Sequence, residues 1–242
     1  MKNQSNQVKE RPIIFSGEMV KAILDGKKTM TRRVVKSDFI GQYEHAHIIN
    51  QSSDKSREGK AYFYDKPVGS MVLSSQLVSN PYGNIGGRLW VRETHHVVGG
   101  IADYEIEEIK QGLQDVKNFV SYKADGYGNP CDGGWTTPMF MPRWASRILL
   151  EIIDIRVERL QDISEADALK EGIRNYNFEM EDSPDTYVGY THLQKDDGKS
   201  TLYKTPAIAF ERLWDTLNAK KGYPWSSNPW VWAIEFKVIE VA

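Results

Sequence analysis

The sequence predicts an α+β fold built on a mixed, barrel-like sheet. The expected elements run strand, helix, several strands, helix, helix, strand, so no βα unit repeats and a doubly wound parallel sheet is not expected. No internal repeat is visible, which excludes a solenoid. The chain of 242 residues is 40% hydrophobic and 26% charged, as in an ordinary globular protein whose core needs no disulfide or metal.

The strands are predicted from short apolar runs, several of which alternate with polar residues. Residues 89–93 are the clearest case, because Leu89, Val91 and Glu93 fall on one face and Trp90 and Arg92 on the other. The full set of expected strands is 13–15, 67–77, 89–93, 119–123, 148–160 and 231–241.

The first helix is expected from Ser16 or Gly17 to Leu24. Four apolar residues repeat there at helical spacing, and Gly26 suits the left-handed position that ends a helix. The residues of this apolar stripe are Met19, Val20, Ile23 and Leu24.

Two further helices are expected in the second half of the chain. Ser164 and Asp167 form a capping-box-like pair at the start of a short helix that ends before Gly172. Thr205 as N-cap and Pro206 at the first position open a longer helix that reaches about residue 219. Its apolar face consists of Ala207, Phe210, Trp214 and Leu217.

The remaining segments set the domain organisation. Residues 1–10 are polar and are expected to form a disordered tail, followed by a single domain over 11–242. Two polar stretches interrupt that domain as insertions near 37–85 and 174–204. We expect loops over 37–60, 80–87 and 125–134 and throughout the second insertion.

Composition limits the location and partners of the chain. The absence of an apolar leader and the single cysteine, Cys131, favour the cytoplasm, and no run approaches the roughly 20 apolar residues of a membrane span. The formal net charge is −2, so no overall field attracts nucleic acid. Five cations without an acid nevertheless stand between Gly26 and Lys36, so any anion site is local.

The basic segment after the first helix is the first candidate site. A turn there lets Lys28 and Thr31 point to one side, and several cations with two hydroxyls suit an anion or a polar base. A solvated turn that complements the helix dipole is the alternative. The candidates in this segment are Gly26, Lys27, Lys28, Thr31, Arg32 and Arg33.

Three further candidates lie outside this segment, and each has a structural alternative. Glu93 either lines a pocket or meets an arginine, since an inward carboxylate must be paired or protonated. Trp90 and Arg92 either contact splayed bases or pack at a rim. Glu171 stands at the end of the second helix, where an exposed residue is the simplest expectation.

No cofactor or metal is expected. His95 and His96 are adjacent, which is not the spacing of ligands on a helix, and the single cysteine excludes a four-cysteine zinc site. The segment GNIGG lacks the Lys-Ser/Thr pair of a phosphate-binding loop and the spacing of a dinucleotide fingerprint.

Four segments together resemble the ASCH domain family, whose fold is similar to the PUA domain, a small β-barrel with flanking helices. GKKTMTRR resembles the family signature through Gly26, Lys28, Thr31 and the arginine pair. RLWVRE and LQDISEADALKEGI resemble a following strand and the short helix, and FERLWDTLNAKKGYPWSSNPWVWAIEF resembles the C-terminal end of a long phage and prophage variant. The resemblance implies a PUA-like barrel and a phage or prophage source.

One branch of small ASCH proteins hydrolyses the acetyl amide of N4-acetylcytidine with a Lys, a Thr and a Glu. The resemblance implies that Lys28 is the base, Thr31 the nucleophile and Glu171 the carboxylate. A threonine hydroxyl becomes nucleophilic when a neighbour takes its proton, and a lysine does so when burial or nearby cations lower its pKa. This chain differs from that branch in its greater length, in Gly87 at an expected Asp, and in the Arg32-Arg33 doublet.

These observations lead to one expected function and two alternatives. We expect a protein that binds RNA or a modified nucleoside in a cationic pocket. The first alternative is an amidohydrolase of an acylated nucleobase with a Lys-Thr-Glu site. The second is a phage accessory factor that contacts host or phage proteins through the stretches 37–60 and 174–204.

Overall fold

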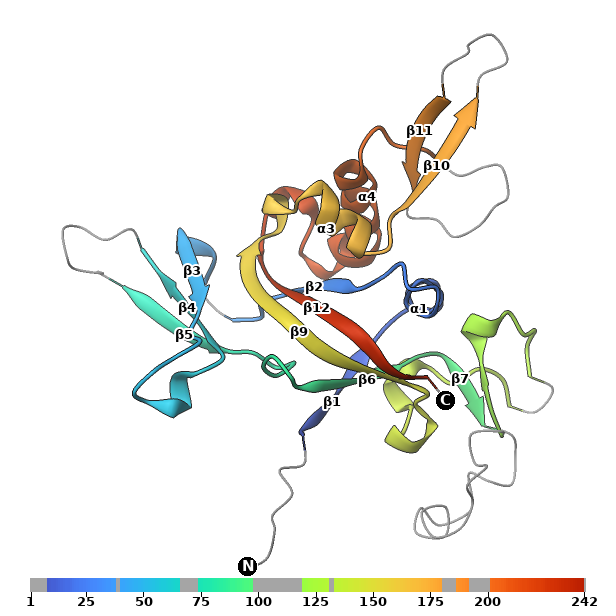
Figure 1. Cartoon of the computed structure of the whole chain (residues 1–242), viewed down its shortest axis with the longest axis horizontal. Coiled ribbons are helices and arrows are strands. Elements are labelled where there is room, and N and C mark those ends of the chain that lie inside the picture. Colours follow the sequence, from blue (N-terminus) through green and yellow to red (C-terminus); the bar gives the residue numbers. More distant parts are fainter. Residues whose placement is uncertain are drawn as a thin grey trace, which may run out of the picture.

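A computed structural model describes residues 8–37, 40–65, 74–97, 119–130, 133–179, 186–191 and 201–241. The chain has a mixed α+β fold, with most strands in several separate sheets and a few helices beside them (Figure 1). This confirms the predicted class. Most of the tail predicted over 1–10 lies outside the described residues, and the first strand already begins at Glu10.

The central sheet has five strands in the order β1-β6-β9-β12-β2. β1 pairs with β6 in parallel, and the other pairs are antiparallel. The strands are β1 (Glu10–Ile14), β2 (Met30–Val34), β6 (Arg88–Arg92), β9 (Ile148–Arg159) and β12 (Trp230–Val241).

This sheet is open, so closure into a barrel is not confirmed. β1 and β2 are its two edges, and none of the sheets formed by the described residues closes on itself. Closure would require the backbones of β1 and β2 to pair. Instead the side chain of Arg33 on β2 donates to the carbonyl oxygen of Ile14 on β1 at 2.6 Å.

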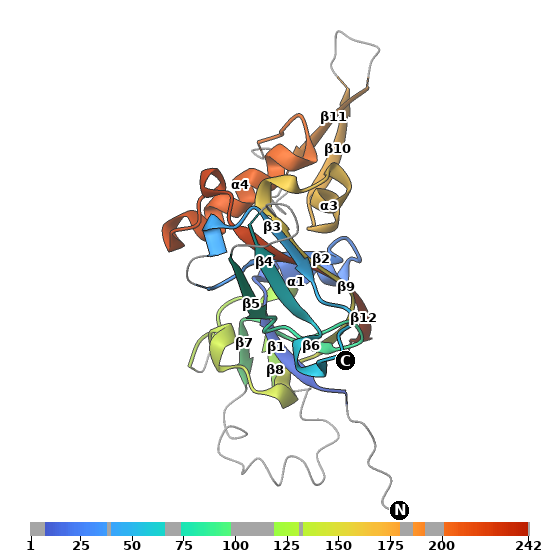
Figure 2. The ribbon, with the colours of Figure 1, turned by 90° about the vertical axis from the view of Figure 1, so that its left-hand side faces the viewer.

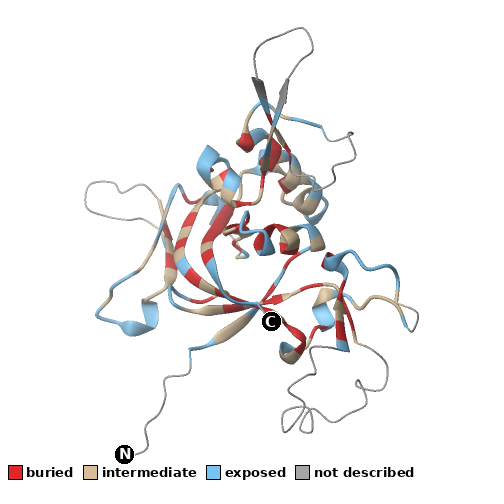
Figure 3. Ribbon diagram, turned by 45° about the vertical axis from the view of Figure 1, so that its right-hand side comes forward, coloured by how far each residue is buried: buried red, intermediate tan, exposed pale blue. Residues whose placement is uncertain are grey.

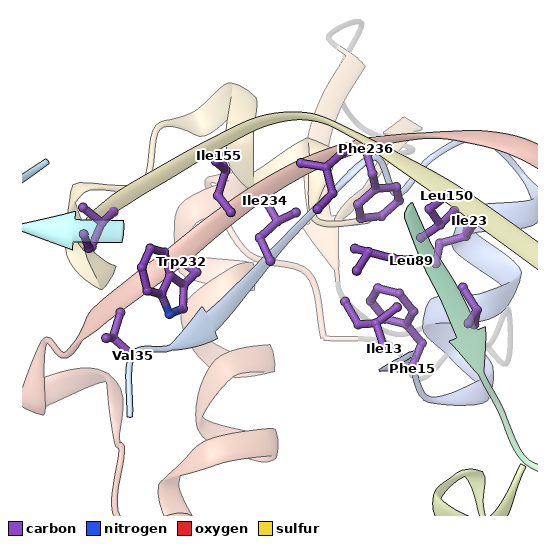
Figure 4. Close-up of a cluster of buried hydrophobic side chains, with 14 of the residues drawn as sticks. Ile13, Phe15, Ile23, Val35, Leu89, Leu150, Ile155, Trp232, Ile234 and Phe236 are labelled. Atoms are coloured by element: carbon purple, nitrogen blue, oxygen red, sulfur yellow. The ribbon is translucent and has the colours of Figure 1, made fainter. Parts of the chain in front are cut away.

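The long strands β9 and β12 form the curved spine of the sheet (Figure 1). Their register shifts twice, leaving Ile153 of β9 and Ile239 of β12 without a partner. Such bulges bend a strand pair and increase its twist. The concave side carries the main core, where residues of β1, α1 (Gly17–Leu24), β6, β9 and β12 meet (Figure 4).

The two insertions contain strands, so the loops predicted over 37–60 and 174–204 are wrong in part. In the first, alternating aromatic and small residues form a three-stranded antiparallel sheet. In the second, a hairpin projects beside the helices, while residues 180–185 and 192–200 lie outside the described residues (Figure 3). These strands are β3 (His45–Ile48), β4 (Lys60–Tyr64), β5 (Ser75–Ser79), β10 (Arg174–Glu179) and β11 (Thr186–Thr191).

The sequence predicts loops here because one side of each strand faces solvent and carries polar or charged residues. A last two-stranded sheet pairs β7 (His95–Val97) with β8 (Val120–Tyr122), within the strand predicted at 119–123. The predicted strand at 67–77 lies largely outside the described residues, with β5 beginning at Ser75.

The three predicted helices are confirmed with their caps. Ser16 caps α1, Ser164 accepts from the amide of Asp167 at the start of α3 (Glu165–Lys170), and Thr205 caps α4 (Pro206–Asn218). α3 and α4 pack together over one end of the sheet (Figure 1), around a second core that includes Phe210 and Trp214.

Two neighbouring isoleucines on β9 test this description of the core. Ile152 is fully buried, whereas Ile153 at the bulge is 41% exposed. Ile152→Ala should lower the free energy of unfolding by about 2–5 kcal/mol, because it leaves a cavity. Ile153→Ala, the matched control, should cost less than about 1 kcal/mol. Urea unfolding measures both, and equal losses would contradict the assigned register.

Candidate active site

The site forms where the segment after α1 meets the end of α3. The backbones of Lys28 and Glu171 form an isolated antiparallel β-bridge. Next to it, the amide of Thr29 donates a hydrogen bond to the carbonyl oxygen of Lys170 at 2.9 Å. The amide of Phe236 on β12 donates to the carbonyl of Thr29 at 2.8 Å. The end of α3 and strand β12, both distant in sequence, are thereby fixed to this short segment after α1.

Two glycines make this approach possible. Gly26 has φ 69° and turns the chain out of α1, and Gly172 has φ 97° and turns it out of α3. A Cβ at Gly172 would lie 3.4 Å from the Cβ of Lys28, so a side chain there would press on the lysine. Both positions lie in the left-handed region that favours glycine.

Lys28 and Glu171 form a buried ion pair. The Lys28 Nζ donates to Glu171 Oε2 at 2.7 Å and to the Glu171 carbonyl oxygen at 2.8 Å. The two residues are only 1% and 4% exposed. Burial lowers the pKa of Lys28; Glu171 opposes this shift, whereas Arg33 and Arg32 reinforce it. Glu171 is therefore buried, and the simple expectation of an exposed residue at the end of this helix is wrong.

Arg32 binds the same carboxylate from the other side. Its guanidinium lies 3.4 Å from Glu171 Oε1, 2.6 Å from Glu158 and 2.9 Å from Asp167. Arg156 extends the network by pairing with Asp167 at 2.8 Å. Because three carboxylates surround Arg32, its charge is balanced within this network and is not available to an anionic ligand.

A pocket of about 970 Å³ opens beside this network. Thr31 and Glu171 both line it, and α4 supplies an apolar and aromatic wall that includes Phe210 and Trp214. The polar and charged residues that complete the lining are Ser16, Arg32, Arg33, Lys36, Ser37, Tyr82, Asn218, Lys221 and Tyr223. The volume lies in the range of small-molecule sites.

Of the expected Lys-Thr-Glu site, the structure pairs Lys28 with Glu171, and Thr31 lines the same pocket as Glu171. Lys28 does not line the pocket, and it lies behind the carboxylate with no exposed side-chain surface. Its amine therefore acts on the pocket through the position and charge of Glu171.

The other candidates of the basic segment divide into two groups. Arg33 lines the pocket, and its guanidinium lies over the Phe15 ring at 5.1 Å. Gly26 and Lys27 do not line it, and the exposed Lys27 lies 3.8 Å from Asp25.

Glu93, Trp90 and Arg92 lie away from this pocket. Glu93 is 1% exposed and binds Arg147 with both oxygens, at 3.0 and 3.1 Å, so the arginine-pairing alternative describes it. Burial raises the pKa of Glu93, and Arg147 opposes this shift. The guanidinium of Arg92 lies over the Trp90 ring at 5.4 Å. This contact agrees with the alternative in which both residues pack at a rim.

Sequence reasoning missed the wall of the pocket. The spacing of Phe210, Trp214 and Leu217 predicts the apolar face of α4, and in the structure this face both packs on the core and lines the pocket. The helical spacing of these apolar residues predicts which face of α4 is apolar, but it does not indicate a cavity beside that face. Tyr82 and Tyr223 come from turns that carry no motif for a site.

Neither metal ligands nor membrane spans are found in the part of the chain described. It contains no group of three or more His, Cys, Asp or Glu residues placed to hold a metal ion. None of its helices combines the length and apolar character required to cross a bilayer.

The chain matches no protein-family model, no curated protein and no solved structure.

The burial of Lys28 predicts a specific pH dependence of stability. Its lowered pKa means that the unfolded chain binds this proton more tightly, so stability rises with pH between the folded-state pKa of Lys28 and the ordinary lysine pKa of 10.5. Relative to Lys28→Met, the wild-type protein should therefore gain stability as the pH approaches that value.

Urea unfolding of both proteins at a series of pH values from neutral to alkaline measures this difference. Lys27→Met, which removes an exposed lysine beside it, should follow the wild-type curve. A constant or falling difference between wild type and Lys28→Met would contradict the assigned environment of Lys28.

Proposed function

We propose that this chain is a PUA-like protein of the ASCH type that binds a nucleobase, in RNA or as a modified nucleotide, in the pocket between β2 and α4. One observation carries the proposal: Thr31 and Glu171 line the same pocket as the aromatic residues of α4. Aromatic faces stack on an unpaired base, and a hydroxyl and a carboxylate read its polar edge.

The held carboxylate favours a base with an exocyclic amino group. Lys28 and Arg32 fix Glu171 from two sides, and an ionised carboxylate only accepts hydrogen bonds. An amino group such as that of cytosine donates to such an oxygen, whereas a bare carbonyl edge would be repelled. Thr31 can donate or accept beside it.

The cations of the pocket favour a nucleotide over a free nucleoside. Arg33, Lys36 and Lys221 line the pocket and form no ion pair in the described part of the chain. Arg32 contributes little to this excess because three carboxylates surround it. A phosphate group would supply the missing negative charge.

Binding of cytidine 5′-monophosphate tests this proposal by calorimetry. The wild-type protein should bind it more tightly than cytidine, and the double variant Lys36→Ala/Lys221→Ala should bind the nucleotide about tenfold more weakly or worse, with little change for cytidine. Lys220→Ala is the matched control, because Lys220 adjoins Lys221 but does not line the pocket. Failure to bind any nucleoside, nucleotide or RNA would refute the proposal.

A second candidate function is hydrolysis of an acylated base amine such as N4-acetylcytidine. It is favoured by the contact of Lys28, whose pKa is lowered, with a carboxylate that lines the same pocket as Thr31. The Thr31 oxygen would add to the acetyl carbon while its proton passes to the Lys28–Glu171 pair. That proton then leaves with the base amine, and water cleaves the acetyl-threonine ester to release acetate and restore the hydroxyl.

Turnover of N4-acetylcytidine, followed by chromatography, tests this candidate. Thr31→Val should lower the rate by about a hundredfold or more, because it removes the nucleophile and keeps the side-chain shape. Thr29→Val, two residues away and outside the pocket lining, should stay within about twofold. An active Thr31→Val protein would rule out the hydrolase assignment, and the binding proposal would stand separately.

A further inference from the structure

A second surface with recognition chemistry lies on the insertion sheet β3-β4-β5. Its outward side carries two histidines of β3 and two tyrosines of β4, here termed the aromatic platform: His45, His47, Tyr62 and Tyr64. Tyr62 and Tyr64 stack at 5.4 Å between ring centroids, with 24° between planes. The histidine rings lie 5.3 to 5.6 Å from these tyrosines.

The platform faces away from the core because side chains alternate along each strand. The opposite side of the same strands packs on the main core through Ala46, Ile48, Ala61 and Phe63. The two histidines are exposed and the two tyrosines half-buried. Figure 2 shows this small sheet in front of the rest of the molecule, on its own side of the fold.

Two cations lie beside the platform. Lys60 precedes Tyr62 by two residues on β4 and so shares its face, and Arg57 lies in the turn that leads into β4. Neither cation forms an ion pair in the described part of the chain. Acids are present as well: Asp54 caps the turn, Glu58 pairs with Lys55 at 2.7 Å, and Glu44 and Asp65 adjoin His45 and Tyr64 in sequence.

We propose that the aromatic platform binds single-stranded nucleic acid by stacking of its bases. Every base has a π-face, so adjacent exposed rings on a sheet bind unpaired bases with little sequence preference. The rings here also carry hydroxyl and imidazole groups, which suits polar bases better than the purely apolar side chains of a protein partner. Arg57 and Lys60 supply contacts to the phosphates.

The platform is separate from the pocket and does not depend on the function proposed for it. The Gln76 side chain of β5, opposite Phe63 in the register, points to the other side of the sheet and donates at 2.9 Å to Ser37, which lines the pocket. The platform and this contact with the pocket lining are therefore on opposite sides of the same small sheet.

Fluorescence anisotropy with labelled U12 and dT12 oligonucleotides tests the proposal on the full chain. Tyr62→Leu/Tyr64→Leu and His45→Ala/His47→Ala should each weaken binding by about fivefold or more, because stacking on two rings is lost. Tyr62→Phe/Tyr64→Phe keeps the rings and should bind like wild type. Tyr127→Leu, at an exposed tyrosine elsewhere, is the control and should also bind like wild type.

The salt dependence gives a second measurement that does not rely on a variant. With two free cations, the slope of log K against log salt should be no steeper than about −1.5. Circular dichroism melts establish that each variant is folded, and cytidine 5′-monophosphate binding reports on the pocket alone.

Three results would overturn the proposal: no binding of either oligonucleotide by wild type, unchanged binding by the leucine variant, or a much steeper slope. Sedimentation that shows self-association lost in the leucine variant would also overturn it, by assigning the platform to a second copy of the chain. Nucleotide binding that persists while oligonucleotide binding fails would refute this inference and leave the pocket proposal intact.

Discussion

The buried contact between Lys28 and Glu171 is the interaction on which the site depends. A buried ion pair costs desolvation on both sides, and removal of one partner leaves an uncompensated charge. The chain meets this cost with two bonds from Lys28 and a further pairing of Glu171 to Arg32. The result is a carboxylate fixed at the wall of a pocket.

The same contact joins parts of the fold that lie far apart in sequence. It links the exit of α1 to the exit of α3, and Thr29 next to it pairs with both Lys170 and Phe236. The left-handed turns at Gly26 and Gly172 bring these exits together. The geometry of the candidate site is thus a consequence of two helix ends that terminate against each other, and the open sheet supports them.

Local signals predicted the caps and helices well, and the resemblance pointed to Lys28, Thr31 and Glu171, whereas long-range features were missed. Glu158 and Asp167 meet Arg32 only after β9 and α3 are placed, so no spacing reveals them. The insertion strands were hidden because their outward sides carry polar residues. Glu93 illustrates the converse, since its burial was predictable from alternation but its partner Arg147 was not.

A crystal structure of the wild-type protein soaked with cytidine 5′-monophosphate tests the central claim most directly. The base should lie against Phe210 and Trp214, with its amino group about 3 Å from the Glu171 carboxylate and Lys28 still bound behind that carboxylate. A nucleotide bound elsewhere, or a Glu171 side chain turned out of the pocket with Lys28 paired to another group, would contradict it.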